Sequence, residues 1–300
     1  MAILMADDVK PLDHYVGMAL DFIGEHGGFS LELPPSRRTL VVGSQNGYWT
    51  GRLVYRQAGR CFSDAEEVQA IEKIDRESGR LGDVAIVSAT GSREVVDVAR
   101  RARERSLPVS AITCNPRSEL KAALGGNFNE IIVPAPAKPE PATINTVTYG
   151  MMIYGATRED PGRIADFIRG MPKPGRGYGE FGSFDLLLPD SMLEVARMAG
   201  WKMVEIFGRG RGALATNITN ARHGGFVRHE PDELVIGIGI DDAQVERLRR
   251  GPIPKENMHL VQAPGDLGPL GYLMASYHII GQIQRGAGDK GFASGLRTYR

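Results

Sequence analysis

The residue types best suited to chemistry are gathered in the turn SATGSRE, residues 88–94. An apolar run, Val84–Val87, leads into this turn. A charged amphipathic segment follows it, and then a second apolar run, Val109–Thr113. This order predicts a strand, a turn, a helix and another strand. Because the first amide groups of a helix lack intrahelical partners and carry a partial positive charge, such a turn favours a bound phosphate.

The side chains of this turn strengthen that prediction. Ser88, Thr90 and Ser92 supply three hydroxyls, Arg93 supplies a guanidinium, and Gly91 allows a tight turn. A phosphate monoester accepts several hydrogen bonds, and an arginine adds a charge-assisted one. The competing interpretation is an ordinary turn in which a serine caps the helix. Three hydroxyls with a glycine and an arginine exceed what capping needs, so we expect an anion site.

A second candidate turn, GSQNGYWTG (43–51), follows the apolar run at 39–43. Ser44, Gln45 and Asn46 offer donors and acceptors of the kind that sugar hydroxyls require, and Gly47 allows close turning. In a parallel sheet both turns lie at the carboxyl ends of strands, where ligands collect at the topological switch point. A plain glycine-rich turn is the alternative interpretation of this segment taken alone.

Composition restricts the class of protein. The chain has 300 residues, 42% hydrophobic and 24% charged, as expected of one large or two medium globular domains. Its 36 basic residues equal its 36 acidic ones, so no overall positive field favours nucleic acid. Cys61 and Cys114 stand far apart without metal-ligand spacing, as in a reducing compartment. No apolar run reaches the ~20 residues of a membrane span, and acids near the first residue disfavour a signal peptide. We expect a cytoplasmic protein with neither metal nor cofactor.

Short apolar strands alternate with helical segments along most of the chain, which predicts an α/β fold with doubly wound parallel sheets. Helices are expected at 9–26, 47–59, 68–78, 117–124, 144–156, 191–199, 212–221, 241–250 and 267–284. Strands are expected at 39–45, 84–87, 109–113, 130–136, 201–207, 233–239 and 258–264.

The pattern occurs twice, which predicts two similar halves. We expect an N-terminal helical segment at 1–35, a first domain at 36–160 and a linker at 161–185, where glycine, proline and charge are frequent. A second domain at 186–285 and a polar tail at 286–300 complete this division.

The two turns, the INTVTYGMM segment and the repeated half together resemble the sugar isomerase (SIS) domain family. The resemblance covers roughly 30–295 and is strongest at 39–115. Within the family the chain looks most like the archaeal-type phosphoglucose/phosphomannose isomerases and the isomerase domain of glucosamine-6-phosphate synthase. The resemblance implies two flavodoxin-like SIS subdomains, each a parallel sheet flanked by helices. It further implies a phosphosugar site between the halves and a homodimer.

The resemblance also implies roles for single residues. Ser88, Thr90 and Ser92 fall in the family's phosphate-binding loop. This chain has Arg93 where the family usually has threonine, and Gly47 where the first loop normally has serine. The segment NARHGG (220–225) resembles the one that carries the ring-opening histidine, which makes His223 the candidate.

The catalytic base is not assigned by this resemblance. The family uses a glutamate shortly before the histidine, yet no glutamate lies between Glu205 and Glu230. Glu205 and Glu180 are the weak candidates that remain. The tail resembles those of family members that insert a lysine into the sugar site, a role open to Lys290 or Arg297; a disordered basic tail is the alternative interpretation.

A further glycine-rich segment, GRGRGA (208–213), permits two interpretations. Arg209 and Arg211 could bind an anion, or the segment could be a degenerate dinucleotide fingerprint. No acidic residue ends a following strand at the expected distance, so a nicotinamide cofactor is disfavoured.

The sequence therefore favours an aldose–ketose isomerase that acts on a phosphorylated or otherwise anionic sugar through an enediol. Such chemistry needs a base that moves a proton between C1 and C2, and groups that stabilise the enediolate oxygen. A non-catalytic sugar-phosphate sensor and a phosphosugar lyase or deglycase are the alternatives.

Overall fold

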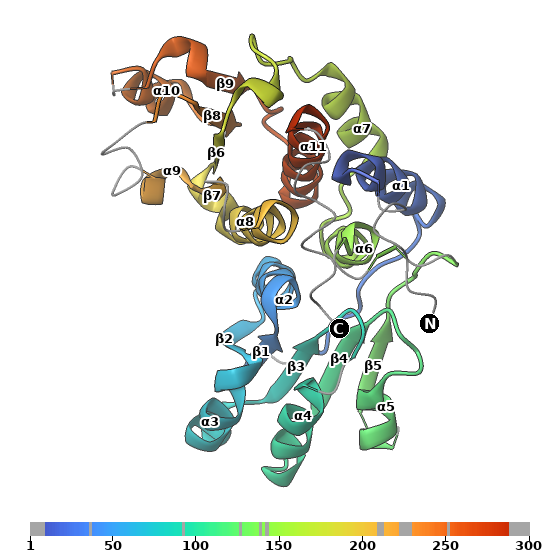
Figure 1. Cartoon of the computed structure of the whole chain (residues 1–300). Coiled ribbons are helices and arrows are strands. Elements are labelled where there is room, and N and C mark those ends of the chain that lie inside the picture. Colours follow the sequence, from blue (N-terminus) through green and yellow to red (C-terminus); the bar gives the residue numbers. More distant parts are fainter. Residues whose placement is uncertain are drawn as a thin grey trace. The chain divides into compact units, whose positions relative to one another are not determined.

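The computed structural model describes residues 10–35, 38–91, 94–125, 128–137, 140–141, 144–208, 213–221, 230–250 and 253–287. Its contacts divide the chain into two units, each built on one sheet (Figure 1). The five-stranded unit comprises Glu25–Pro139 and Asn145–Arg158. The four-stranded unit comprises Met1–Gly24, Glu140–Ile144 and Glu159–Arg300.

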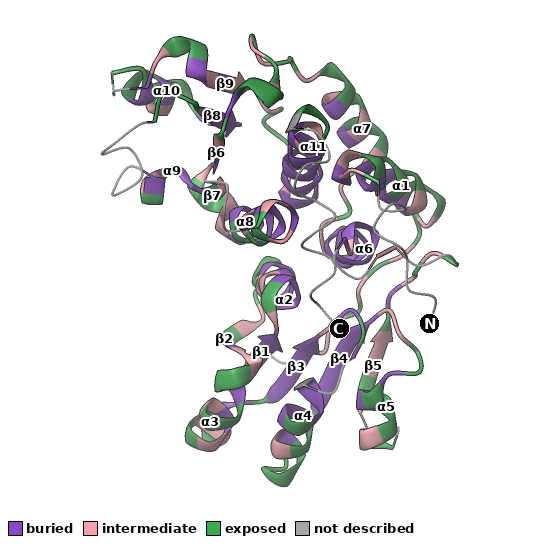
Figure 2. Ribbon diagram, in the orientation of Figure 1, coloured by how far each residue is buried: buried purple, intermediate pink, exposed green. Residues whose placement is uncertain are grey.

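The five-stranded sheet is parallel throughout, with strand order β2-β1-β3-β4-β5. Its strands are β1 (Thr39–Gly43), β2 (Cys61–Glu66), β3 (Asp83–Val87), β4 (Val109–Thr113) and β5 (Asn129–Ile132). Every residue of β1, β3 and β4 is buried, because helices cover both faces of the sheet (Figure 2). The strand order reverses between β1 and β3, which is the switch point of this topology.

The helices of this unit form two layers. They are α2 (Gln45–Gln57), α3 (Glu67–Glu77), α4 (Glu94–Glu104), α5 (Glu119–Leu124) and α6 (Thr146–Thr157). Helices α3, α4 and α5 share a hydrophobic core with one face of the sheet, where Leu40, Val84 and Ile86 point. Helix α2 packs on β1 and against α6. Arg158 is the C-cap of α6, and its guanidinium donates hydrogen bonds to the Gly27 and Phe29 carbonyls of the same unit.

The four-stranded sheet repeats this winding. Its strands are β6 (Ser183–Leu188), β7 (Ala213–Asn217), β8 (Glu233–Ile238) and β9 (Met258–Val261), all parallel in the order β7-β6-β8-β9. The order therefore reverses between β6 and β8, as it does between β1 and β3.

The helices around this sheet include segments from both ends of the described chain. They are α1 (Leu12–Glu25), α7 (Pro161–Gly170), α8 (Leu193–Phe207), α9 (Ile218–Asn220), α10 (Asp242–Arg249) and α11 (Pro269–Ala287). Helix α11 contacts α7 and α8. It is also joined to α1, since Gln284 accepts a hydrogen bond from the Leu12 N–H (2.7 Å) and Arg285 pairs with Asp13 (2.7 Å).

The predicted α/β class with two parallel sheets is confirmed, as are most predicted elements. The strand predicted at 201–207 is wrong, because α8 continues through Gly200 to Phe207. Gly200 does not end the helix. A Cβ there would lie 3.3 Å from the Ala215 carbonyl, so glycine serves the close packing of α8 on β7. Buried residues recur at helical spacing on both sides of it.

The helix predicted at 212–221 is also wrong. Its described part forms strand β7 and a single helical turn, α9.

Strand β2 was not predicted, since CFSDAE has a polar, half-buried pattern that is typical of an edge strand. The predicted linker at 161–185 contains helix α7 and the start of β6. None of the described helices is long and apolar enough to cross a membrane.

Candidate functional site

The two predicted turns begin side by side. Gly43, the last residue of β1, pairs with Val87, the last residue of β3, in a parallel register. The segments 44–47 and 88–91 therefore both leave the carboxyl edge of the five-stranded sheet at its switch point. Ligands of open α/β sheets bind at this position.

The turn after β3 is held in a specific shape. Gly91 has φ of 59°, a left-handed conformation that favours glycine. A Cβ at this position would also lie 2.5 Å from the Cβ of Ser118. The Gly91 N–H donates a hydrogen bond to Ser88 Oγ (3.1 Å). Ser88 is half-buried and Thr90 is exposed, so both side chains lie where a ligand could reach them.

Two carbonyls of this turn, those of Ala89 and Thr90, face residues 113–115. The Ala89 oxygen accepts hydrogen bonds from the Cys114 N–H (3.1 Å) and the Thr113 hydroxyl (3.0 Å). The Thr90 oxygen accepts one from Asn115 Nδ2 (3.0 Å). In a trans peptide the N–H points opposite to the C=O, so the Thr90 N–H points away from residues 113–115. Nothing in the described part of the chain accepts a hydrogen bond from it.

The turn after β1 supplies a second set of donors. Ser44 is the N-cap of α2, yet its side chain makes no capping hydrogen bond among the described residues, and the first helical turn contains no acid. Gln45 is exposed, with φ of 47°. Asn46 is only 5% exposed, and its Oδ1 has no hydrogen-bond partner within the structure as described. The start of α2 is thus a neutral helix N-terminus, which attracts anions.

Gly47 has a packing role in this structure. It is buried, and a Cβ there would lie 2.7 Å from the Val87 carbonyl oxygen. Glycine therefore lets α2 approach the end of β3, which holds the two turns together. This contact accounts for a glycine at the position where the resembling family has serine.

The two candidate bases lie in the four-stranded unit, and both are engaged in other contacts. Glu205 on α8 accepts from Lys202 Nζ (2.7 Å), and the side chain of Lys202 is only 1% exposed. Glu180 accepts from the Gly177 N–H (2.9 Å) and from Arg176 (3.2 Å), and these hydrogen bonds lower its pKa. A carboxylate with a lowered pKa is a weak base, so Glu180 is not prepared for proton abstraction, while the Glu205 carboxylate is occupied by the Lys202 ammonium.

Several predicted site residues lie outside the described residues, so their positions are not part of this geometry. They are Ser92, Arg93, Arg209, Arg211, His223, Lys290 and Arg297.

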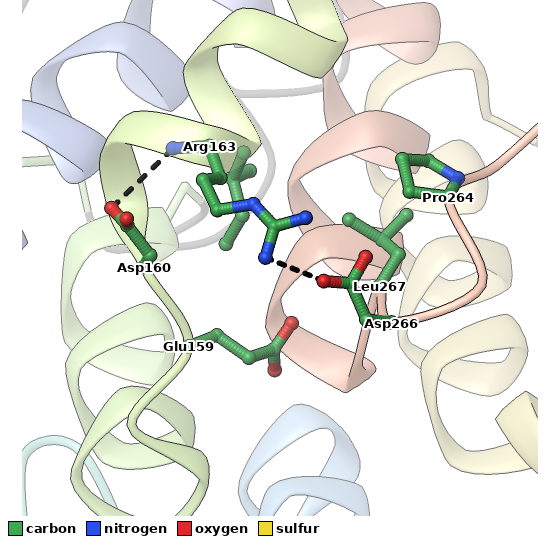
Figure 3. A pocket seen from close by; sticks show the side chains of 7 residues that line it. Glu159, Asp160, Arg163, Pro264, Asp266 and Leu267 are labelled. Carbon is green, nitrogen blue, oxygen red and sulfur yellow. Dashed lines mark hydrogen bonds and ion pairs between the residues drawn. The ribbon is translucent and has the colours of Figure 1, made fainter.

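The four-stranded unit also has a pocket of about 190 Å³ beside the start of α11, lined by Glu159, Asp160, Arg163, Ile164, Pro264, Asp266 and Leu267 (Figure 3). Its charges are already paired. Arg163 forms an ion pair with Asp266 (2.5 Å). Glu159 accepts from the N–H groups of Gly268, Leu270 and Gly271 at 2.8–3.0 Å. We therefore do not place the site here.

Among the described residues, no group of three or more His, Cys, Asp and Glu side chains could hold a metal ion.

The positions of Thr113, Asn115 and Ser118 were not predicted. Thr113 is the last residue of β4 and the other two follow it, and all three contact the turn after β3 from one side. Their signal in the sequence is weak: an Asn-Pro pair directly follows an apolar strand that neighbours the anion turn.

Comparison with known proteins supports the fold. No family model matches the chain, and no curated protein matches it. Its structure is similar to glucosamine-6-phosphate deaminase from Thermotoga maritima, with TM-score 0.65 and 14% identity, covering 94% of this chain and 93% of that one. It is also similar to the C-terminal domain of glucosamine-fructose-6-phosphate aminotransferase from Francisella tularensis (TM-score 0.64, 11% identity, 92% and 97% covered). A third similar structure is tagatose-6-phosphate ketose/aldose isomerase from Escherichia coli (TM-score 0.57, 13% identity, 91% and 87% covered). At these identities the likeness establishes the fold alone.

Proposed function

We propose that the chain binds a phosphorylated sugar at the carboxyl edge of the five-stranded sheet and interconverts its aldose and ketose forms. The observation that carries this proposal is the turn after β3. Its Thr90 N–H and Ser88 side chain lie beside the uncapped start of α2. Backbone amides, a hydroxyl and a neutral helix N-terminus are the groups that bind phosphate. The similar structures named above act on, or are named for, 6-phosphorylated sugars.

The remaining predicted residues complete the proposed site. Ser92 and Arg93 extend the phosphate-binding turn, while Ser44, Gln45 and Asn46 bind sugar hydroxyls. The buried, unpartnered Oδ1 of Asn46 supports this assignment, because a buried polar atom needs a partner. His223 assists ring opening, and a base yet to be assigned moves the proton between C1 and C2. A homodimer, implied by the resemblance, is part of the same proposal.

A sugar-phosphate sensor without catalysis is the second candidate. The observation that favours it is the state of Glu205 and Glu180, which are held by Lys202 and by Gly177 and Arg176. An enediol mechanism requires a carboxylate or another base within hydrogen-bond reach of the sugar C1–C2 bond.

Two measurements test the proposal. Titration calorimetry with glucose 6-phosphate and fructose 6-phosphate should show binding that Ser88→Ala weakens roughly tenfold or more, because a hydrogen bond to a charged group is lost. Ser78→Ala is the matched control: it lies before β3 at the opposite edge of the same sheet, and affinity should not change. Unchanged affinity in Ser88→Ala would mean that the anion site lies elsewhere.

NMR in D₂O then separates the candidate functions. An isomerase should incorporate solvent deuterium at C1 or C2 of the bound hexose phosphate. Binding without incorporation supports the sensor, and release of a substituent from the sugar supports the lyase or deglycase.

A further inference from the structure

The last residue of β4 and the segment that follows it form hydrogen bonds to one side of the anion turn. We call residues 113–120 the bracing segment. Strands β3 and β4 are parallel neighbours, with Val87 opposite Ile112, so both segments leave the same edge of the sheet. Three consecutive carbonyls of the turn each accept hydrogen bonds from the bracing segment. The acceptors are Ala89, Thr90 and Gly91, and the last of them accepts from the Leu120 N–H (3.3 Å).

The Asn115 side chain donates a hydrogen bond to the turn through its amide nitrogen and accepts one through its amide oxygen. Its Nδ2 donates to the Thr90 oxygen (3.0 Å), while its Oδ1 accepts from the Arg117 N–H (3.0 Å). Its own N–H donates to the Thr113 hydroxyl oxygen (3.1 Å). Both side-chain polar atoms are therefore satisfied, and the direction of the amide is determined.

The hydrogen bond from Asn115 to the Thr90 oxygen also affects the Ser88 side chain, two residues before Thr90. It holds the Thr90 C=O toward the bracing segment, and peptide planarity then turns the Gly91 N–H to the other side. There the Gly91 N–H donates to Ser88 Oγ. Because this contact occupies a lone pair of the Ser88 hydroxyl, the hydroxyl hydrogen remains available to donate to an acceptor outside the turn.

We propose that Asn115 is a positioning residue of the anion site. Acting through the Thr90–Gly91 peptide, its side-chain amide orients the Ser88 hydroxyl as a donor to the bound phosphate. This inference rests on the proposed function only for the identity of the ligand. The orientation itself rests on the hydrogen bonds of residues 88–91 and 115.

Asn115→Ser provides the first test. Serine can still accept from the Arg117 N–H, but it is too short to donate to the Thr90 oxygen. We expect affinity for glucose 6-phosphate, measured by calorimetry, to fall roughly fivefold while the thermal midpoint stays close to that of the wild type. Asn129→Ala, which removes an exposed asparagine from β5 of the same sheet, is the matched control and should bind as the wild type does.

A double-mutant cycle distinguishes positioning from a general structural role. If Asn115 acts through Ser88, then Asn115→Ser should weaken binding little further once Ser88→Ala is present. Additive losses, or unchanged affinity in Asn115→Ser alone, would overturn the proposal.

A readout without ligand separates this inference from the proposed function. In the free protein, hydrogen exchange of the Gly91 amide should become several-fold faster in Asn115→Ser, because the peptide is no longer held. If wild type binds no sugar phosphate but Gly91 exchange responds, the proposed function fails and the positioning role stands. If Gly91 exchange is unchanged, the positioning role is wrong whatever the ligand.

Discussion

The two sheets of this protein wind in the same order, but the turns at their carboxyl edges differ in charge and in what their amide groups bind. In the five-stranded unit, β1 and β3 are followed by Ser44 and Ser88. In the four-stranded unit, β6 and β8 are followed within three residues by Asp190 and Asp241. Equivalent topology therefore carries neutral donors at one edge and carboxylates at the other.

The carboxylates of the four-stranded unit bind its own helix amides. Asp241 accepts from the Gln244 N–H (2.8 Å), and Asp160 from the Gly162 N–H (2.8 Å). Glu159 does the same at the start of α11. Amides that are already paired with a carboxylate cannot take up an anion from solution. A repeated fold therefore need not repeat a binding site, because a few acidic residues are enough to occupy the amide groups.

The strongest test of this difference is a matched pair of glycine substitutions. Gly91 and Gly239 follow β3 and β8 and have φ of 59° and 63°. A Cβ would crowd Ser118 in the first case and overlap the Tyr272 hydroxyl in the second. We expect each change to alanine to destabilise its unit by roughly 2–5 kcal/mol, from left-handed strain and overpacking. Urea unfolding measures this.

The two variants should differ in binding. Gly91→Ala should abolish detectable sugar-phosphate binding, whereas Gly239→Ala should retain it under conditions where the protein is folded. Equal loss of affinity in both variants would remove the distinction between the two edges.

A smaller effect should appear in the pH dependence of the four-stranded unit. Burial, together with the nearby Glu233 carboxylate, raises the pKa of Asp185 on β6 to about 7. An unfolded chain releases this proton near pH 4, so the stabilisation is full below about pH 4 and is lost as the pH rises through about 7. We expect this group to lower the free energy of unfolding by on the order of 4 kcal/mol between these limits.

Urea unfolding at several pH values measures this contribution. Asp185→Asn should flatten the dependence over that window, while Asp97→Asn, at an exposed position on α4, should leave it unchanged. An equal slope in wild type and Asp185→Asn would show that Asp185 does not hold the proton.

The smallest effect is expected at Asp190. Its carboxylate accepts from Asn217 Nδ2 (2.7 Å), from the Thr219 N–H (3.0 Å) and from the Thr219 hydroxyl (2.7 Å). Asp190→Ala should lower stability by roughly 1–2 kcal/mol, because the half-exposed Thr219 donors regain water while the buried Asn217 Nδ2 loses this acceptor. Sugar-phosphate affinity should not change if the only role of Asp190 is to hold the segment after β6 against residues 217–219. A gain or loss of affinity would show that the acidic edge takes part in binding.

The sequence predicted the fold and the position of the turn after β3, because both depend on local patterns. Alternating apolar runs predicted the parallel sheets, and the hydroxyls and glycine of residues 88–91 predicted the turn. The prediction failed where packing outweighed local preference. Gly200 lies within α8 because β7 approaches it closely, and the polar residues of β2 are tolerated at a sheet edge.

The contacts of the bracing segment could not be predicted from the sequence, for a different reason. Asn115 lies 25 residues from Thr90 in sequence, and only the pairing of β3 with β4 brings them together. A single sequence shows which residues could donate a hydrogen bond. It does not show which carbonyl will face the donor.

The pairing of α1 with α11 has a consequence for how the protein is made. The contact between Leu12 and Gln284 spans 272 residues, and so does that between Asp13 and Arg285. On the ribosome, α1 emerges before α11 and can form these contacts only after α11 has been synthesised. The segments of the five-stranded unit, which end at Arg158, are complete long before then. Synthesis therefore completes the segments of the five-stranded unit well before the polar contacts between α1 and α11 can form.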